Sequence, residues 1–518
     1  MFRSCLLGLF LITFTHHLSS QIEGDDLFGT DQIISIELDF PQSNYWTTLV
    51  ANYEADENEY IVGNLTLTDI YGTQTFDSVG VRLKGNSSYS HPGNKKSFKI
   101  DFNKFVAGQN YDGLKKLNFS NGFKDPTCMR EKVFSDICLA AGVLAPRTSF
   151  AEVNFNSTAW GFYTVVEQID DQFMDWAILD DDGNLFKAGD NFGGGPGGSG
   201  GDAADLLYYG SEQSAYESRY ELKSNEDLND WTDLISFLDF INNSSNEEFE
   251  TLLPNQLELT EYLRSAALDN LFSNLDSYTG SARNYYLYHN LSSNKWEWIK
   301  WDGNETFGSY SNGVNGMTTL ALNYHDDDRP LLERIFENEN LYNLYLQELC
   351  DIQEQYFNST YMDARIDEVK NLIQSSVYAD NNKMYSNADF DTNIENDLGG
   401  GPGPGGGTTY GLKSFVASKG NYVQGQVDCS LFTGLEDLEL VTVSLYPNPA
   451  SDRVQLDLSR QIGSVHVQFI ASDGRIVLEE WMQGGRICEL DISRLPSGLY
   501  GIQIRAKDYF GRSRLIIE

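Results

Sequence analysis

Hydrophobic and polar residues alternate along much of the N-terminal part of the chain. In QIISIELDF (32–40) and SFKIDF (97–102) an apolar side chain recurs at every second position, which is typical of a strand with one buried face. Strands are predicted over residues 32–40, 60–69, 78–83, 97–102, 149–155 and 161–166. A β-hairpin is predicted later, from 283–289 and 295–301 with a turn at 291–294.

Helical spacing begins after the first four of these strands. In MREKVFSDICLAA (129–141) apolar residues recur every three or four positions, and Gly142 is a natural end for that helix. Further helices are predicted over residues 230–241, 260–275 and, with short breaks, 331–373. Strands and helices together predict an α+β body.

The last eighty or so residues differ from this body in pattern and in charge. Short alternating runs return there, separated by turns at 447–449, 473–474 and 496–498, which is the pattern of a small all-β sandwich. Residues 440–518 carry nine acidic and nine basic side chains, whereas the whole chain has a net charge of −40. The body therefore carries the entire negative charge, and a domain boundary is predicted near residue 440.

Composition narrows the class of protein. With 41% hydrophobic and 13% aromatic residues the chain can bury a large core, so global disorder is excluded. A net charge of −40 without a basic patch repels phosphate backbones and anionic membranes, so nucleic acid is not an expected partner. The same charge suits a soluble protein outside the cell that meets divalent cations.

The N-terminus has the features of a secretory signal peptide. Arg3 precedes an apolar run at 5–15 and small residues at 19–20, which predicts a signal peptide over 1–20; a buried strand is the alternative. No later run is long enough for a transmembrane segment. In the oxidising compartment that a signal implies, Cys128 and Cys138 either form a disulfide or remain buried thiols, and spacing alone leaves both open.

Two glycine- and proline-rich tracts interrupt the body. FGGGPGGSGG (192–201) is predicted to be a loop inside the domain, and GGGPGPGGG (399–407) to belong to a linker over 396–439. A phosphate-binding loop is the alternative for either tract. That alternative is disfavoured because neither is followed by Lys-Ser/Thr on a helix.

The stretch 269–308 holds the strongest candidate chemistry. A helix predicted to end at Asp276 is followed by Asn284 in a loop and by Asp302 after the hairpin. Phosphoryl transfer uses such a set: one carboxylate orients the attacking hydroxyl, and an amide and a second carboxylate hold Mg²⁺. The alternative is that these are ordinary loop acids in an acidic chain.

A second stretch, 81–102, could bind phosphate. Its Gly/Asn/Ser turn lies between two strands, and Lys95 and Lys96 open the second strand. Backbone N–H groups and a strand lysine can bind phosphates together, and Glu131 on the following helix could fix that lysine. An ordinary hairpin with solvated lysines remains the alternative.

These segments resemble the CotH kinase family. The matching pieces are RLKGNSS, KKSFKIDF, CMREKVFSDICLAAGV, APRTSF, GFYTVVEQID, DSYTGSARNYYLY and WIKWDGNETFG, in the family's order across residues 34–378. The resemblance implies an atypical, two-lobed protein-kinase fold. It also implies the use of ATP with Mg²⁺ or Mn²⁺ to phosphorylate secreted or surface proteins.

The resemblance assigns roles residue by residue. It implies a metal site of Asp302 with Asn284 and Asn304, and Asp276 as the catalytic-loop acid. The implied contacts to ATP come from Lys84, Lys96, Lys99, Glu167 and Ile169. Lys96 is the preferred phosphate-binding lysine because it shares a face with Phe98, and Glu131 is its expected partner.

Two departures from the family pattern leave a second function open. Lys84 stands where the family often has arginine, which loses a bidentate fork, and Asn304 replaces the second acid of Trp-Asp-x-Asp, which removes a charge from the metal site. The alternative function is therefore a weak or inactive kinase-like surface binding protein. A Ca²⁺-stabilised structural protein ranks last, because DDDGN (180–184) lacks the ligand spacing of an EF-hand.

The tail has a resemblance of its own. SLYPNPASDRVQLDL, DGRIV and LDISRLPSGLYGIQI resemble the C-terminal sorting domain of type IX secretion in Bacteroidota; a generic adhesive β-domain is the alternative. This implies export through the periplasm and contact with the type IX machinery. The expected plan is a signal peptide (1–20), a kinase-like domain (21–395), a linker (396–439) and a sorting domain (440–518).

Overall fold

The computed structural model describes most of the body and much of the tail. The described residues are 22–55, 59–91, 93–178, 180–189, 202–399, 408–432, 439–440, 444–457, 465–471, 476–482, 487–506 and 509–517. The predicted signal peptide, the loop 192–201 and residues 400–407 of the second tract lie outside them.

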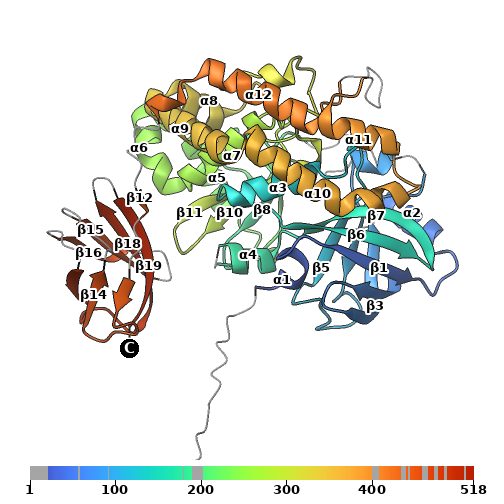
Figure 1. Ribbon diagram of the computed structural model, residues 1–518, viewed down its shortest axis with the longest axis horizontal. Helices are drawn as coiled ribbons and strands as arrows, with labels where there is room; N and C mark the ends of the chain where they lie inside the picture. The colour runs from blue at the N-terminus through green and yellow to red at the C-terminus, as the bar shows by residue number, and fades with distance from the viewer. Residues whose placement is uncertain are drawn as a thin grey trace, which may run out of the picture.

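A closed barrel forms the N-terminal part of the body (Figure 1). Its strands are β1 (Ile33–Asp39), β2 (Ile61–Thr68), β3 (Thr73–Leu83), β4 (Phe98–Asp101), β5 (Lys116–Ser120), β6 (Thr148–Phe155) and β7 (Thr158–Glu167). Their order is β1-β2-β3-β4-β5-β7-β6, and a parallel pairing of β1 with β6 closes the ring. The alternating side chains fill the barrel core, which confirms the predicted strands of this region.

Short helices accompany the barrel. They are α1 (Asp25–Phe28), α2 (Tyr45–Glu54) and α4 (Asp171–Ala177), together with the longer α3 (Arg130–Ala140). The α3 helix was predicted from its spacing, and most of its side chains are buried. It joins the core of the helical part of the body, which also takes Phe150 and Phe162 from the outside of the barrel.

The rest of the body is mostly helical. A four-stranded sheet, ordered β11-β10-β8-β9, is made of β8 (Leu185–Ala188), β9 (Tyr220–Leu222), β10 (Tyr285–Asn290) and β11 (Lys295–Lys300). The helices are α5 (Thr232–Asn243), α6 (Asn246–Gln256), α7 (Leu259–Leu271), α8 (Pro330–Glu337), α9 (Glu339–Gln355), α10 (Ser359–Ala379), α11 (Asn387–Glu395) and α12 (Leu412–Gln426). Figure 1 shows α8, α9 and α12 grouped together and α10 extending over the barrel, where it contacts β7. None of the helices described here is long and apolar enough to cross a membrane.

Two predictions for the body are wrong. The helix expected to reach Asp276 ends at Leu271, because the chain turns there into an irregular loop that hydrogen-bonds to itself. Residues 412–426 are not linker: they form α12, whose buried Phe415 packs edge-on against Phe307 at a centroid distance of 5.8 Å. Glycine-rich sequence on one side masked the helical spacing that follows.

The described strands of the tail form two small sheets. One is ordered β12-β19-β18-β15-β16 and the other β13-β14-β17. Their bounds are β12 (Glu439–Leu440), β13 (Ser444–Tyr446), β14 (Arg453–Asp457), β15 (Val465–Ala471), β16 (Ile476–Met482), β17 (Ile487–Asp491), β18 (Gly498–Ala506) and β19 (Tyr509–Ile517). Apolar side chains of both sheets, such as Leu456 and Phe469, share one core.

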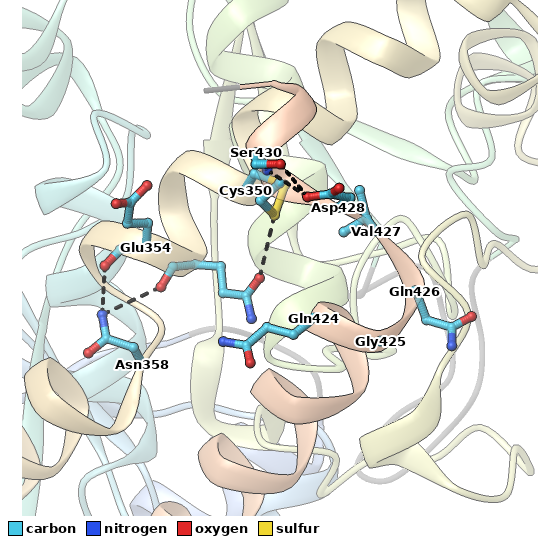
Figure 2. Close-up of a pocket in the computed structure, with 11 residues that line it drawn as sticks. Cys350, Glu354, Asn358, Gln424, Gly425, Gln426, Val427, Asp428 and Ser430 are labelled. Atoms are coloured by element: carbon cyan, nitrogen blue, oxygen red, sulfur yellow. Dashed lines mark hydrogen bonds between the residues drawn. A yellow bond between two sulfur atoms is a disulfide. The ribbon is translucent and has the colours of Figure 1, made fainter. Parts of the chain in front are cut away.

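A disulfide joins Cys350 in α9 to Cys429 after α12, while Cys128 and Cys138 are buried free thiols. The sequence left the state of Cys128 and Cys138 open and did not identify the bonded pair. Figure 2 shows the disulfide beside a polar surface pocket at the ends of α9 and α12. Gln353 adds a second tie by donating to the Gly420 carbonyl at 2.9 Å.

We expect the double substitution Cys350→Ser/Cys429→Ser to destabilise the body. The disulfide spans 79 residues of sequence, so its loss frees a long loop in the unfolded chain and is expected to cost about 2–5 kcal/mol. Urea unfolding of the full chain, compared with Cys128→Ser as a thiol control, measures the change. Equal unfolding midpoints for the double variant and wild type would contradict a stabilising role.

Candidate functional site

One cleft of the body lies between the outside of the barrel and the turn that follows β11. Side chains that pair across β3, β4, β5 and β7 point into the barrel, and their sequence neighbours point outward into the cleft. The inward row is Leu83, Phe98, Phe119 and Val165, and the outward row is Lys84, Ser97, Ser120 and Thr164. The other lining residues are Gly85, Ser88, Asn121, Gly122, Phe123, Asp125, Glu131, Val166, Trp301, Asp302 and Asn304.

Lys84 is the central cation of this cleft. Burial lowers its pKa to about 8, while the charges of Asp302 and Glu131 act in the opposite direction. Burial likewise raises the pKa of Glu131 to about 7, against the charge of Lys84. The Lys84 ammonium also lies over the Trp301 ring, 5.2 Å from its centroid. Lys84 thus lines the cleft together with two acids whose charges act on it.

Lys96, the preferred lysine of the sequence analysis, lies elsewhere. Its ammonium donates to the carbonyls of Tyr89 and His91 at 2.6 and 2.7 Å, and it does not line the cleft. The pairing of Lys96 with Glu131 is therefore wrong. The prediction failed because Phe98 points into the barrel core. A lysine on the same face of the strand as Phe98 is therefore turned away from the cleft.

Lys99 lies on the outward face with Lys84, nearer the strand connection after β7. Its ammonium donates to Gln168 Oε1 at 2.6 Å. Burial and the neighbouring cations Arg82 and Lys84 hold its pKa well below the usual value. Within the barrel wall, Arg82, Lys84 and Lys99 therefore form a concentration of positive charge in an otherwise acidic protein.

Glu167 and Ile169 do not line the cleft. Glu167 is buried and accepts hydrogen bonds from Arg147 Nε at 3.0 Å and Trp176 Nε1 at 2.9 Å, so its carboxylate is committed to structure. Ile169 belongs to a small apolar cluster with Phe173. Their side chains are therefore removed from the set of expected nucleotide contacts, whereas neighbouring Val166 does line the cleft.

Asp276 and Asn284 meet in the loop after α7. Asn284 Nδ2 donates to Asp276 Oδ2 at 3.0 Å and to its backbone carbonyl at 2.8 Å, and Ser281 Oγ donates to Asp276 Oδ1 at 2.9 Å. Asn284 has a left-handed backbone, with φ of 60°, which asparagine tolerates better than most residues. The loop thus fixes the orientation of the Asp276 carboxylate.

A buried ion pair supports this loop from behind. Lys300 and Asp269 lie 2.5 Å apart with side chains that are 4% and 3% exposed. Asp269 Oδ1 also accepts from Asn274 Nδ2 at 3.0 Å, two residues before Asp276. Sequence reasoning missed this pair, because nothing in a linear pattern marks which of many acids is buried.

Asp302 and Asn304 occupy the turn after β11. Asp302 has φ of 57° and begins the short 3₁₀ turn η3 (Gly303–Glu305). A Cβ at Gly303 would lie 2.5 Å from Phe134 Cδ1 of α3, so the close approach of the turn to that helix requires glycine. The packing places Asp302 and Asn304 in the lining of the same cleft as Lys84.

Sequence reasoning also missed Lys124 and Glu305. Their side chains form an ion pair at 3.0 Å, and burial raises the pKa of Glu305, with Lys124 opposing and Asp276 reinforcing that shift. The charge of Glu305, in the turn of Asp302, therefore interacts with the charge of Asp276 in the loop after α7. The available signal was a second acid, directly after Asn304, in the motif WDGNETFG.

The donor set fits a magnesium–nucleotide complex better than a metal held by protein alone. Within the described parts of the chain no group of three or more His, Cys, Asp and Glu side chains is arranged to hold a metal ion. Mg²⁺ with nucleotides uses one or two carboxylates and takes its other ligands from phosphate and water. Asp302, the amide oxygen of Asn304 and Lys84 line the cleft and meet that requirement, whereas Asn284 contacts Asp276 and does not line the cleft. A structural Ca²⁺ site at 180–184 has less support, because Asp180 accepts hydrogen bonds from Ser292 and Tyr288.

Comparison with known proteins identifies two families in this chain. Residues 81–398 match the family model described as CotH kinase protein, and residues 444–518 match the secretion system C-terminal sorting domain. The inner spore coat protein H of Bacillus subtilis is 26% identical over 309 residues, covering 57% of this chain and 77% of that protein.

Two relatives from Rhizopus delemar are more distant. Invasin CotH2 is 22% identical over 394 residues, covering 72% of this chain and 63% of the relative, and invasin CotH3 is 22% identical over 419 residues, covering 76% and 68%. The chain thus spans less than two thirds of invasin CotH2. The matched families confirm both resemblances seen in the sequence and make this a secreted or surface protein. The chain belongs to the CotH kinase protein family and carries a type IX secretion sorting domain at its C-terminus.

Proposed function

We propose that this protein is a secreted protein kinase that transfers the γ-phosphoryl group of ATP to hydroxyl groups of secreted or surface proteins. The observation that carries the proposal is Lys84, a cation that lines the same cleft as Glu131 and Asp302 and is influenced by the charges of both. Phosphoryl transfer depends on positioning and charge stabilisation, which such a cation supplies. The barrel and the helical part would be the two lobes of a kinase-like domain.

Each residue has a defined task in this mechanism. Lys84 binds the ATP phosphates and is oriented by Glu131, while Lys99 lies on the same outward face of the barrel. Asp302, with Asn284 and Asn304, would hold Mg²⁺ or Mn²⁺, and the bound metal would neutralise phosphate charge. Lys84, Glu131, Asp302 and Asn304 line the cleft, whereas the roles of Lys99 and Asn284 rest on the family resemblance.

The transfer itself involves one bond made and one bond broken. The acceptor hydroxyl oxygen bonds to the γ-phosphorus as the bond from that phosphorus to the β,γ-bridging oxygen breaks, and ADP leaves with that electron pair. Asp276 orients the hydroxyl and accepts its proton, which then passes to water. Because Ser281 and Asn284 hold its two carboxylate oxygens, Asp276 is already oriented before the acceptor arrives.

Lys84 gives nucleotide affinity a pH dependence. Its pKa of about 8 means that the empty site holds the neutral amine above that pH. Phosphate binding then requires proton uptake, so ATP affinity is expected to fall up to about tenfold per pH unit above that value. Lys84→Arg stays charged and is expected to flatten the profile measured by calorimetric titration. Equal slopes for both proteins would assign the titration to another group.

A second candidate function is a surface binding protein without turnover. Asn304 stands where the family motif has an acid, which lowers the charge available for metal. Two relatives are named invasins. This alternative keeps the cleft as a structural feature or as a ligand site.

Transfer of a labelled phosphoryl group separates the two functions. The full chain is incubated with γ-labelled ATP, Mg²⁺ or Mn²⁺, and a mixture of secreted proteins from the same source. Kinase activity predicts label in protein that disappears with EDTA. Absence of label with either metal, while ATP still binds, would favour the binding protein instead.

A further inference from the structure

The loop after β5 forms one rim of the cleft and is anchored at both ends. Asn121 Nδ2 donates to the Lys95 carbonyl at 3.0 Å, which ties the start of the loop to the barrel. Asp125 Oδ2 accepts from the Arg130 backbone N–H at 2.9 Å, which ties its end to α3. Gly122, between these anchors, has φ of 71°, so the middle of the loop follows a path that few side chains permit.

Lys124 reaches from this loop to the opposite wall. Its ammonium lies 3.0 Å from Glu305 Oε1, and Glu305 belongs to the turn that carries Asp302 and Asn304. The preceding residue, Phe123, lines the cleft, and the Lys124 ammonium lies 5.3 Å from its ring centroid. The ion pair therefore joins the cleft-lining loop to the turn of Asp302 and Asn304, although neither Lys124 nor Glu305 itself lines the cleft.

Glu305 and Lys124 differ in burial and in hydrogen bonding. The Glu305 side chain is 5% exposed and its Oε2 has no hydrogen-bond partner among the described atoms, whereas the Lys124 side chain is 32% exposed. Glu305 is thus a fixed, buried acceptor, and Lys124 is a partly solvated residue on a loop. Lys124 also has φ of 58°, a left-handed conformation that costs a non-glycine residue free energy and persists only where contacts maintain it.

We propose that the Lys124–Glu305 ion pair is a clasp that holds the loop 121–125 against the turn η3 and controls passage of nucleotide into and out of the cleft. This inference rests on the proposed function for the identity of the ligand. When the clasp opens, Lys124 is hydrated and Phe123 moves with the loop. When it closes, the cleft is covered and Glu305 regains its counterion.

The clasp makes a kinetic prediction. Weakening it lowers the free energy needed to open the loop, so nucleotide should leave faster. Lys124→Met keeps the length of the side chain but removes the charge, and Glu305→Gln keeps the shape of the acceptor. Each is expected to raise the dissociation rate of mant-ATP with Mg²⁺ by about three- to tenfold in stopped-flow displacement. The double variant should raise the mant-ATP dissociation rate little beyond that of either single variant, since both substitutions remove the same contact.

A matched pair elsewhere provides the control. Lys295 and Glu258 also lie 3.0 Å apart, with comparable exposure of the lysine, and they are not in the cleft. Lys295→Met should therefore leave the mant-ATP dissociation rate unchanged. Lys124 is the primary test site because it is partly exposed, so Lys124→Met is decisive even where Glu305→Gln folds poorly.

Amide hydrogen exchange tests the clasp without nucleotide. Peptides covering residues 118–129 of the full chain should exchange faster in Lys124→Met than in wild type or Lys295→Met. If wild type binds no mant-ATP, the proposed nucleotide function fails, and the exchange result still decides whether the contact closes the loop. Unchanged exchange together with an unchanged dissociation rate in Lys124→Met would overturn the clasp.

Discussion

Asp276→Asn is expected to lower the rate of phosphoryl transfer by about 10²–10⁴-fold, the usual contribution of a positioned general base. The amide cannot accept the proton of the acceptor hydroxyl. It also presents an N–H₂ group to either Ser281 or Asn284, both of which donate to Asp276. Single-turnover transfer of γ-labelled phosphate measures the rate directly.

The same variant should bind ATP nearly as well as wild type. Asp276 does not line the cleft, so the expected change in ATP affinity is within about threefold, and the loss falls on kcat. Asn243→Asp, in the exposed end of α5, controls for a surface change of similar size. A transfer rate equal to wild type would remove Asp276 from the mechanism, and an equal loss of affinity and rate would make its role structural.

Lys84→Met is expected to lower kcat/KM for ATP by about 10²-fold or more, since it removes the cation that stabilises charge on the phosphates. The substitution also leaves Glu131 and Asp302 without the cation between them. Lys96→Met is the matched control, because Lys96 is near in sequence but bonds only to loop carbonyls among its described contacts. Its kcat/KM should stay within about threefold of wild type.

The activities of Lys84→Met and Lys96→Met show which lysine binds phosphate: Lys84, which lines the cleft, or Lys96, which the sequence pattern favoured. A kcat/KM for Lys84→Arg well above that of Lys84→Met would confirm that a positive charge is required at this position. The longer guanidinium need not restore the full wild-type value. A large loss in Lys96→Met with little change in Lys84→Met would contradict the site described above.

Much of the fold could be predicted from hydrophobic patterning. The barrel strands other than β5, together with α3 and the hairpin β10–β11, follow from local spacing, because each buries one continuous face. Strand β5 was not predicted. The closure of the barrel through the parallel pair β1–β6 could not be predicted, since it joins strands more than a hundred residues apart. Helix α12 was missed because its spacing follows a glycine-rich tract that reads as linker.

The candidate site was predictable in its residue types and only partly in its geometry. Asp276 and Asn284 are brought together, and Asp302 and Asn304 share the cleft with Glu131. The choice between Lys84 and Lys96 depended on which strand face meets the helical part of the body. Alternation within one strand cannot reveal this, because it separates the two faces without saying which one is the barrel interior. Lys124 and Glu305 pair across 181 residues, a contact that no local pattern contains.

Thermal melting of the full chain with Mg²⁺ or Mn²⁺, with and without ATP, beside Asp302→Ala, tests the nucleotide site most directly. Binding to the folded state stabilises it by RT ln(1 + [L]/Kd), about 2.7 kcal/mol at a hundredfold excess over Kd. The account predicts a rise in Tm that requires both ATP and metal and is lost in Asp302→Ala. No rise in wild type at millimolar ATP with either metal, or an equal rise in Asp302→Ala, would contradict it.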